Sequence, residues 1–279
     1  MDEQISPYGK NPTTNIAKVR IRHLEEMKEQ GRKWAMLTSY DMYTAAIFEE
    51  AGIPVLLVGD SASNNVFGYD TSLPITVDEL IPLVRAVTRS TQRPLVIADL
   101  PFGSYQGSPE QCFHTAVRFM KEGGAHAVKL EGGLDMLPQV EKLVSAGMPV
   151  MAHIGFTPQA EHQLGGYRVQ GKEDRGQQLI ETAKAFETAG AFSVLIEMVP
   201  AEVGAAITKA VRIPTVGIGA GNGCDAQVLV WQDMAGLRNG RLPRFVKQYA
   251  EMNKLLSEAA EAFMNDVVNG DFPGPGHSF

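Results

Sequence analysis

The sequence predicts a (β/α)8 barrel, because eight short apolar segments alternate with segments of helical periodicity along its 279 residues. The short segments are continuously apolar, which is typical of parallel strands covered on both faces. Glycine separates a helical segment from the next strand at Gly52, Gly123, Gly147 and Gly190, and a glycine in this position commonly ends a helix. A doubly wound open sheet has the same alternation and is the alternative architecture.

In chain order, we expect first a helix at about 15–30 that caps the bottom of the barrel. The eight strands are expected at 34–38, 55–58, 95–98, 127–130, 150–152, 193–196, 215–218 and 228–230. The intervening helices are expected at 77–91, 109–122, 134–146, 174–189 and 201–211. A further helix ends near Asn269 and Gly270, and a Pro/Gly-rich tail follows at about 270–279. No linker interrupts the alternation, so we predict a single domain over 1–279.

Local signals support these boundaries. The helix at 77–91 is preceded by Thr76 and contains Glu79, which is the spacing of a capping box. The longest polar, glycine-rich connections are 59–76 and 154–171, and both follow predicted strands. A barrel of this kind places its active-site loops after its strands, so these two connections are expected at the functional end.

Composition excludes several classes of protein. A formal net charge of −7 argues against nucleic-acid binding, which needs clustered Lys and Arg. No apolar run approaches the ~20 residues that span a bilayer, and the polar segment 1–14 lacks the apolar stretch of a signal peptide. Cys112 and Cys224 lie far apart in no metal-ligand spacing and are expected to be reduced thiols. We therefore expect a soluble, cytoplasmic protein that acts on small molecules.

Polar and ionisable residues recur at the C-terminal ends of five predicted strands. They are Asp60, Ser61, Asp99, Lys129, Glu131, His153 and Glu197. An isolated aspartate in this position is more often a helix N-cap, but five strands share the pattern. In a closed parallel barrel these strand ends converge on one mouth, where such barrels carry their active sites. The sequence therefore predicts one shared site.

The acidic residues of this set favour a hard divalent cation. Asp60, Asp99 and Glu131 offer oxygen ligands without any cysteine, and Mg2+ prefers such ligands while keeping positions open for a chelating substrate. Mn2+ and Co2+ accept the same ligands. The alternative is that the two aspartates merely pair with Arg or Lys. Lys129 shares a strand face with Glu131, and a buried lysine needs an anion, which could be Glu131, a substrate carboxylate or both.

Two further residues of the set have acid–base interpretations. Glu197 lies in an apolar segment, where desolvation favours proton uptake by a carboxylate and suits a general base near neutral pH; a structural glutamate paired with a lysine is the alternative. His153 could be a metal ligand, a hydrogen-bond donor or a satisfied core histidine. The glycine-rich stretch 217–223 fails the dinucleotide-binding register, so we interpret it as a close backbone approach or a tight turn at the barrel mouth.

Several segments together resemble the ketopantoate hydroxymethyltransferase family. They are Val-Gly-Asp-Ser at 58–61, Ala-Asp-Leu-Pro-Phe at 98–102, Val-Lys-Leu-Glu-Gly-Gly at 128–133, His-Ile-Gly-Phe-Thr-Pro-Gln at 153–159, Gly-Gly-Tyr at 165–167 with Val-Gln-Gly at 169–171, and Ile-Gly-Ala-Gly at 218–221. The resemblance runs in the same order from about residue 15 to the C-terminus. It implies a barrel similar to those of phosphoenolpyruvate mutase and isocitrate lyase.

The resemblance also implies a reaction. Members of the family transfer a hydroxymethyl group from 5,10-methylenetetrahydrofolate to 3-methyl-2-oxobutanoate, giving 2-dehydropantoate for pantothenate synthesis through an enolate that Mg2+ stabilises. By resemblance, Mg2+ would bind Asp60 and Asp99, Glu131 would complete its shell, Glu197 would be the base and His153 would support them. The residues implied at the substrate are Asp60, Ser61, Asp99 and Lys129. A cytoplasmic homodecamer is also implied.

The alternative function is a lyase or mutase of the same barrel superfamily that acts on a 2-oxo acid or phosphoenolpyruvate. Such relatives typically carry a cysteine-containing loop after a middle strand, and the sequence has no such motif. One departure from the ketopantoate hydroxymethyltransferase pattern is Ala160-Glu161-His162, where that family commonly has Ser-Val-Asn. This departure concerns a loop near the barrel mouth and leaves the predicted metal site intact.

Overall fold

The computed structural model describes residues 17–279. The polar segment 1–14 and the predicted helix start at residue 15 therefore lie outside the described residues. The chain divides into two compact units, one that ends at Val228 and one that comprises Leu229–Phe279. The interpretation of the whole chain as a single domain stays a prediction.

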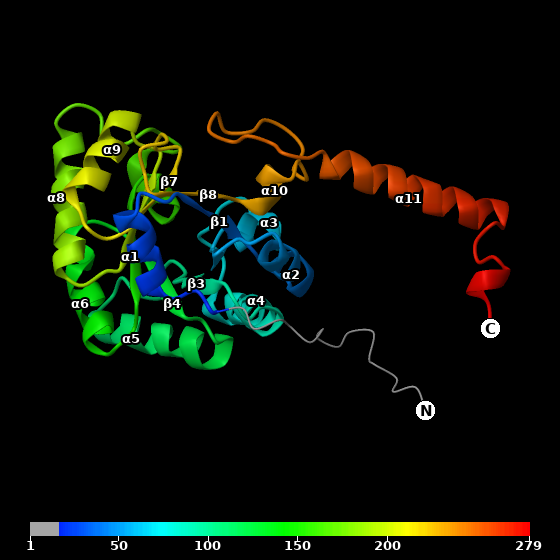
Figure 1. Ribbon diagram of the computed structural model, residues 1–279, viewed down its shortest axis with the longest axis horizontal. Coiled ribbons are helices and arrows are strands. Elements are labelled where there is room, and N and C mark those ends of the chain that lie inside the picture. Colours follow the sequence, from blue (N-terminus) through cyan, green and yellow to red (C-terminus); the bar gives the residue numbers. More distant parts are fainter. Residues whose placement is uncertain (1–16) are drawn as a thin grey trace. The chain divides into compact units, whose positions relative to one another are not determined.

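Eight parallel strands form a closed barrel in the order β1 to β8 (Figure 1). Their bounds are β1 (Trp34–Thr38), β2 (Val55–Val58), β3 (Leu95–Asp99), β4 (Ala127–Glu131), β5 (Val150–Gly155), β6 (Ser193–Glu197), β7 (Thr215–Ile218) and β8 (Ala226–Leu229). The predicted (β/α)8 barrel is confirmed, and closure of the sheet excludes the open, doubly wound alternative.

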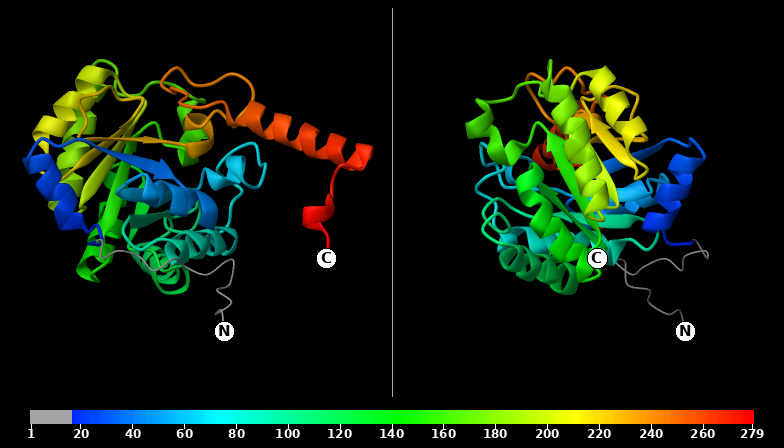
Figure 2. Two further views of the ribbon diagram at one scale, coloured as in Figure 1. Left: turned by 45° about the vertical axis from the view of Figure 1, so that its right-hand side comes forward. Right: turned by 90° about the vertical axis from the view of Figure 1, so that its left-hand side faces the viewer.

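Helices follow the strands and lie outside them, as Figures 1 and 2 show for the segments coloured green to yellow. The α-helices of the barrel unit are α1 (Ile21–Glu29), α2 (Met42–Glu50), α3 (Ala62–Asn65), α4 (Val77–Ser90), α5 (Pro109–Arg118), α6 (Leu137–Ser145), α7 (Glu161–Leu164), α8 (Arg175–Thr188) and α9 (Ala201–Ala210). Three other helical segments are η1 (Phe119–Gly123), η2 (Leu134–Met136) and η3 (Pro158–Ala160). The capping box predicted for α4 is present, with Thr76 and Glu79 bonded reciprocally.

Helix α1 caps the bottom of the barrel, as predicted. Its Leu24 is fully buried in the interior cluster that includes Met36 and Val55 near the N-terminal ends of β1 and β2. The Lys28 ammonium donates to the Ile213 carbonyl at 3.0 Å and forms a 2.9 Å ion pair with Asp225, which anchors α1 below β7 and β8. Helix α1 thus covers the N-terminal ends of the strands, and the polar residues lie at the opposite, C-terminal ends.

The differences from the predicted elements have local causes. β8 lies at Ala226–Leu229 instead of 228–230, because its residues alternate between buried and exposed, with Gln227 outside, and do not form a continuous apolar run. The helix predicted at 109–122 divides into α5 and the π-helix η1. Helix α2 was not predicted; Asp41 caps it by accepting two backbone N–H bonds.

The unit Leu229–Phe279 contains α10 (Trp231–Met234), α11 (Met252–Asn269) and η4 (Pro275–His277). Helix α11 ends at Gly270 in the left-handed conformation, as predicted for this end of the chain. None of the α11 residues is buried. Among the described residues, no helix combines the length and apolar character that crossing a bilayer requires.

Candidate active site

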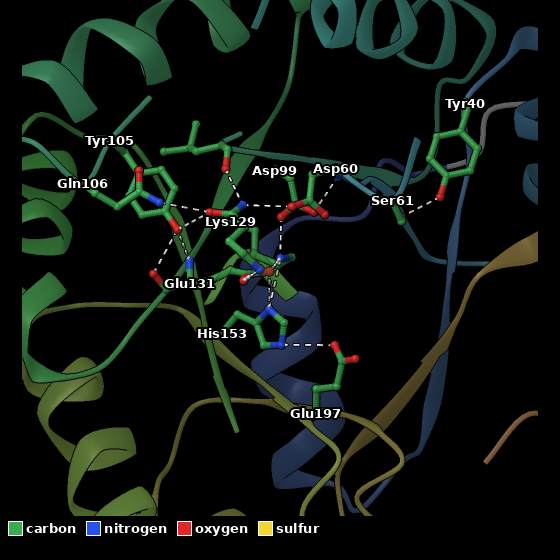
Figure 3. A network of polar contacts seen from close by, with 12 residues as sticks. Tyr40, Asp60, Ser61, Asp99, Tyr105, Gln106, Lys129, Glu131, His153 and Glu197 are labelled. Carbon is green, nitrogen blue, oxygen red and sulfur yellow. Dashed lines mark hydrogen bonds and ion pairs between the residues drawn. The ribbon is translucent and has the colours of Figure 1, made fainter. Parts of the chain in front are cut away.

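The strand-end residues predicted to share a site do lie together at one end of the barrel (Figure 3). Pairing between neighbouring strands aligns Asp99 with Lys129 and Glu131 with His153, so side chains from β3, β4 and β5 become neighbours. Glu197 ends β6, and Asp60 and Ser61 follow β2 directly. Closure of the barrel is what brings the charged members of this set, which are remote in sequence, into one network. The Ser61 side chain instead contacts Tyr40.

Lys129 lies at the centre of the acidic group. Its Nζ is 2.5 Å from Asp99 Oδ1 and 3.6 Å from Glu131 Oε1, and all three side chains are at most 3% exposed. Lys129 and Glu131 therefore share a strand face, as predicted. The nearest anion to Lys129 is Asp99, so the pairing of this aspartate with a lysine, which was stated as the alternative to metal binding, is present. The other Asp99 oxygen, Oδ2, accepts the Asp60 backbone N–H at 3.0 Å.

His153 connects the acidic group to Glu197. Its Nδ1 lies 3.0 Å from Glu131 Oε1 and its Nε2 lies 3.3 Å from Glu197 Oε2. Burial and Lys129 oppose protonation of the imidazole, but the neighbouring carboxylates of Glu131 and Glu197 raise its pKa to about 9. The imidazolium form donates from Nδ1 to Glu131 and forms an ion pair through Nε2 with Glu197, which favours the hydrogen-bond-donor interpretation.

The acidic side chains differ in how strongly their surroundings favour the ionised form. Burial, followed by repulsion from Asp99 and Glu131, raises the pKa of Asp60 well above its usual range. Burial also raises the pKa of Asp99, although Lys129 opposes the rise. Burial disfavours ionisation of Glu131 too, but His153 and Lys129 outweigh it and lower the pKa. Repulsion from Asp99 and Glu131 thus adds to the cost of ionising Asp60, and a further cation beside these carboxyl groups would offset that repulsion.

A second group of residues, which sequence reasoning did not assign a role, holds these acids in place. Gln159 donates from Nε2 to Asp60 Oδ2 at 2.9 Å and from its backbone N–H to Glu131 Oε2 at 3.1 Å. The Tyr105 hydroxyl donates to Gln159 Oε1 at 2.7 Å. Tyr40 is hydrogen-bonded to Ser61 at 2.8 Å between the two hydroxyl oxygens. The only sequence signal was the position of Gln159 in a recognised segment.

The backbone around Glu197 is held by close contacts. Phe156 donates its N–H to the Glu197 carbonyl at 2.8 Å, and Gly155 has φ +95°. A Cβ added to Gly155 would lie 2.2 Å from the same carbonyl oxygen, so β5 can approach β6 this closely only with glycine. Met198, directly after Glu197, has φ +48°, which is unusual for a residue with a side chain.

The glycine-rich stretch after β7 packs against α9. A Cβ on Gly221 would lie 2.5 Å from Ala201 Cβ, and a Cβ on Gly204 would lie 2.4 Å from the Ala220 carbonyl oxygen. Gly219 and Gly221 both have positive φ. These glycines therefore allow a tight turn and a close approach to a helix, which is the simpler of the two interpretations of this stretch.

The acidic side chains alone do not form a complete coordination shell for a divalent cation. Within residues 17–279, no three His, Cys, Asp or Glu side chains are arranged to hold a metal ion by themselves. Lys129 instead occupies the space between Asp99 and Glu131. However, Mg2+ is commonly held by one or two carboxylates while water and substrate supply its other ligands. The side chains of Asp60 and Asp99 could supply these two carboxylates.

Comparison with known proteins identifies the family. A sequence profile described as "Ketopantoate hydroxymethyltransferase" matches residues 18–275. The chain is 62% identical over 286 residues to a Nocardioides protein named "3-methyl-2-oxobutanoate hydroxymethyltransferase", covering 99% of this chain and 97% of the relative. The chain belongs to the ketopantoate hydroxymethyltransferase family. The resemblance stated from the sequence motifs is therefore confirmed.

Solved structures show the same fold at much lower identity. Phosphonopyruvate hydrolase aligns with a TM-score of 0.60 and 13% identity over 92% of each chain. A 2,3-dimethylmalate lyase, described as a PEP mutase/isocitrate lyase superfamily member, aligns with a TM-score of 0.57 and 15% identity over 92% of each chain. These similarities show the barrel fold that the resemblance to the ketopantoate hydroxymethyltransferase family implied.

The two cysteines do not support the lyase or mutase alternative. Cys112 lies in α5 and Cys224 lies in the turn before β8, and both are buried. Burial raises the pKa of Cys112 to about 12 and raises that of Cys224, so neither is poised to ionise. Neither belongs to a loop at the C-terminal ends of the middle strands, as a catalytic thiol of the alternative would.

Proposed function

We propose that this protein transfers a hydroxymethyl group from 5,10-methylenetetrahydrofolate to 3-methyl-2-oxobutanoate, forming 2-dehydropantoate in pantothenate biosynthesis. Family membership supports the reaction. The observation that carries the proposal in the structure is the arrangement of Glu197, which is 13% exposed and faces the buried acidic group through His153. A carboxylate at the edge of an enclosed polar site can take a proton from a bound keto acid.

Glu197 acts as the general base in this proposal. It accepts the proton from C3 of the substrate, and the electron pair of that C–H bond becomes the enolate. Water hydrolyses the two C–N bonds of the folate's methylene carbon, which gives tetrahydrofolate and a one-carbon unit at the oxidation level of formaldehyde. The C3 carbon bonds to that carbonyl carbon, and the resulting alkoxide takes up a proton to become the hydroxymethyl group. The ion pair between His153 Nε2 and Glu197 Oε2, at 3.3 Å, favours a carboxylate directed toward the acidic group. Because Nδ1 of the same ring is fixed by Glu131, the ring cannot rotate away.

Mg2+ is the proposed metal, and Asp60 and Asp99 are the residues that would hold it, with Glu131 completing the shell through water. When bound, the ion supplies Lewis-acid stabilisation of the negative charge that develops on the keto oxygen. Lys129 and Ser61 are proposed to hold the substrate carboxylate, together with Asp60 and Asp99 through the metal. Lys129 would offset the negative charge of the substrate carboxylate, which is costly to bring into a buried site that already contains acidic side chains.

Assembly and location are also proposals. We propose a cytoplasmic homo-oligomer, a decamer by family resemblance, that takes small-molecule substrates and binds neither nucleic acid nor membrane. Helix α11 supports self-association, because it has no buried residue and exposes several large apolar side chains. They are Leu255, Leu256, Phe263, Met264, Val267 and Val268. The net charge of −7 supports the absence of a nucleic-acid partner.

The test is an assay with 3-methyl-2-oxobutanoate and 5,10-methylenetetrahydrofolate, with and without EDTA. We expect 2-dehydropantoate to form, EDTA to abolish its formation, and added Mg2+ to restore it. No 2-dehydropantoate in the presence of Mg2+ would reject the transferase. Cleavage of a 2-oxo acid without folate would favour the lyase or mutase, and full activity in EDTA would reject the metal.

A further inference from the structure

A buried carboxamide connects two of the acids that come from different strands. Gln159 lies in η3, four residues beyond the end of β5, and is 7% exposed. Its Nε2 donates to Asp60 Oδ2 at 2.9 Å and to the Leu100 carbonyl at 2.9 Å. Its backbone N–H donates to Glu131 Oε2 at 3.1 Å. One residue therefore restrains a carboxylate that follows β2 and another that ends β4.

The orientation of this carboxamide is determined by its neighbours. Gln159 Oε1 accepts from the Tyr105 hydroxyl at 2.7 Å and from Gln106 Nε2 at 3.1 Å. A flipped amide would place Oε1 against Asp60 Oδ2 and the Leu100 carbonyl, so two acceptors would face two acceptors. The observed orientation, with the NH2 group toward Asp60, is therefore the one that satisfies every polar atom of the amide.

Tyr105 is itself fixed. Its side chain is fully buried, and its hydroxyl oxygen accepts the Glu131 backbone N–H at 3.1 Å. That bond leaves the single hydroxyl proton to be donated, and the shortest contact, 2.7 Å, is to Gln159 Oε1. The tyrosine thus links the backbone of β4 to the amide that holds Asp60. Lys129 restrains Asp99 and Glu131, whereas Gln159 donates to the Asp60 carboxylate.

We propose that Gln159, oriented by Tyr105, is the positioning residue that sets the divalent-cation affinity of the Asp60 and Asp99 pair. This inference rests on the proposed metal site and adds to it. A carboxylate that binds a cation needs a fixed plane and an oxygen with a free lone pair. A neutral donor that binds its other oxygen fixes the plane, leaves the first oxygen free and adds no positive charge that would compete with the metal. An ammonium in that place would compete with the metal.

The experiment measures Mn2+ binding directly, by electron paramagnetic resonance of the free ion, for the full-length protein and three variants. Gln159→Met keeps side-chain length and removes both amide groups. Tyr105→Phe keeps the ring and removes the hydroxyl. Gln139→Met is the matched control, because Gln139 is a buried glutamine, 4% exposed, whose contact is a 3.4 Å bond to the Tyr105 carbonyl and not to a carboxylate.

We expect Gln159→Met to raise the Mn2+ Kd by about 10- to 100-fold, the range found when the partner of a metal-binding side chain is removed. Tyr105→Phe should raise the Kd less, and Gln139→Met should stay within about twofold of the wild type. The Mg2+ concentration for half-maximal activity should move in parallel, with kcat at saturating Mg2+ largely restored. A purely structural role would instead lower kcat at every Mg2+ concentration.

Other results would reject either the positioning role of Gln159 or the proposed metal site. A wild-type Kd for Gln159→Met, or an equal rise for Gln139→Met, rejects the positioning role while the metal site stands. Absence of Mn2+ binding by the wild-type protein rejects the proposed metal site itself. If Gln159→Met fails to give a cooperative unfolding transition, Tyr105→Phe decides, and an unchanged Kd for that variant rejects the inference.

Discussion

Replacement of Gly155 by alanine tests whether the contact between β5 and β6 positions Glu197, the proposed base. The added Cβ would lie 2.2 Å from the Glu197 carbonyl oxygen and 3.0 Å from Val199 Cγ1. Ordinary contacts of this kind are longer by roughly 1 Å, so the backbone at Glu197 must move by about that amount. A misplacement of about 1 Å can cost ~100-fold in rate.

The same change also destabilises the fold. An alanine at φ +95° costs about 1 kcal/mol in backbone strain, and loss of the 2.8 Å bond from Phe156 to Glu197 costs about 1 kcal/mol more. We therefore expect the free energy of unfolding to fall by about 2–4 kcal/mol in a urea titration. The Mn2+ Kd should stay near the wild-type value, because Asp60 and Asp99 belong to other strands.

Gly147→Ala is the matched control, since Gly147 has φ +81° but no atom within 4 Å of an added Cβ. It shares the backbone strain, at about 1 kcal/mol, without the clash. The assay is exchange of the C3 hydrogen of 3-methyl-2-oxobutanoate in D2O, followed by NMR, which reports proton removal without folate. Equal exchange rates for Gly155→Ala and Gly147→Ala would refute the claim that this contact positions Glu197.

Three further changes test the charges. Glu197→Gln should slow C3 exchange by at least ~100-fold at an unchanged urea midpoint, because the partly exposed carboxyl contributes little to folding. Lys129→Met leaves Asp99 buried without its cation and should lower the free energy of unfolding by about 3–5 kcal/mol in urea; an unchanged value would contradict the ion pair. Burial, Lys18 and Arg20 lower the pKa of His126 to about 4, so the unfolded chain takes up a proton first as the pH falls below 6.5. Between pH 7 and pH 5 the wild type should therefore lose about 1 kcal/mol more of its free energy of unfolding than His126→Asn, which keeps an acceptor for the Val96 N–H.

Apolar runs located the strands well but ended them too early at the functional mouth. β3, β4 and β6 each include the acidic residue that the prediction placed directly after the strand, namely Asp99, Glu131 and Glu197. Closure of the barrel keeps these residues in the hydrogen-bonded ladder, where partners on neighbouring strands and a polar interior replace the apolar environment. The hydrophobicity of one segment cannot reveal that its last residue is acidic and still part of the strand, because the polar partners that stabilise this residue lie on other strands.

The chemistry of the site was predictable where it depended on residue type and strand position. The role of Gln159 was not, because a neutral amide on a loop has no charge, spacing or periodicity that marks it. Its function follows from contacts with Asp60 and Tyr105, which are 99 and 54 residues away in sequence. The protonation of His153 was equally inaccessible, since it depends on Glu131 and Glu197 reaching opposite nitrogens of one ring.

The position of Lys129 limits how it can serve a substrate. An ammonium has three N–H donors. Asp99 at 2.5 Å takes one, and Glu131 at 3.6 Å is close enough to attract a second. His153 lies 3.3 Å away and, as an imidazolium, offers Lys129 no lone pair. One donor therefore remains for the proposed substrate carboxylate, so Lys129 would bind the keto acid while it stays paired with Asp99, and the same charge would serve both partners.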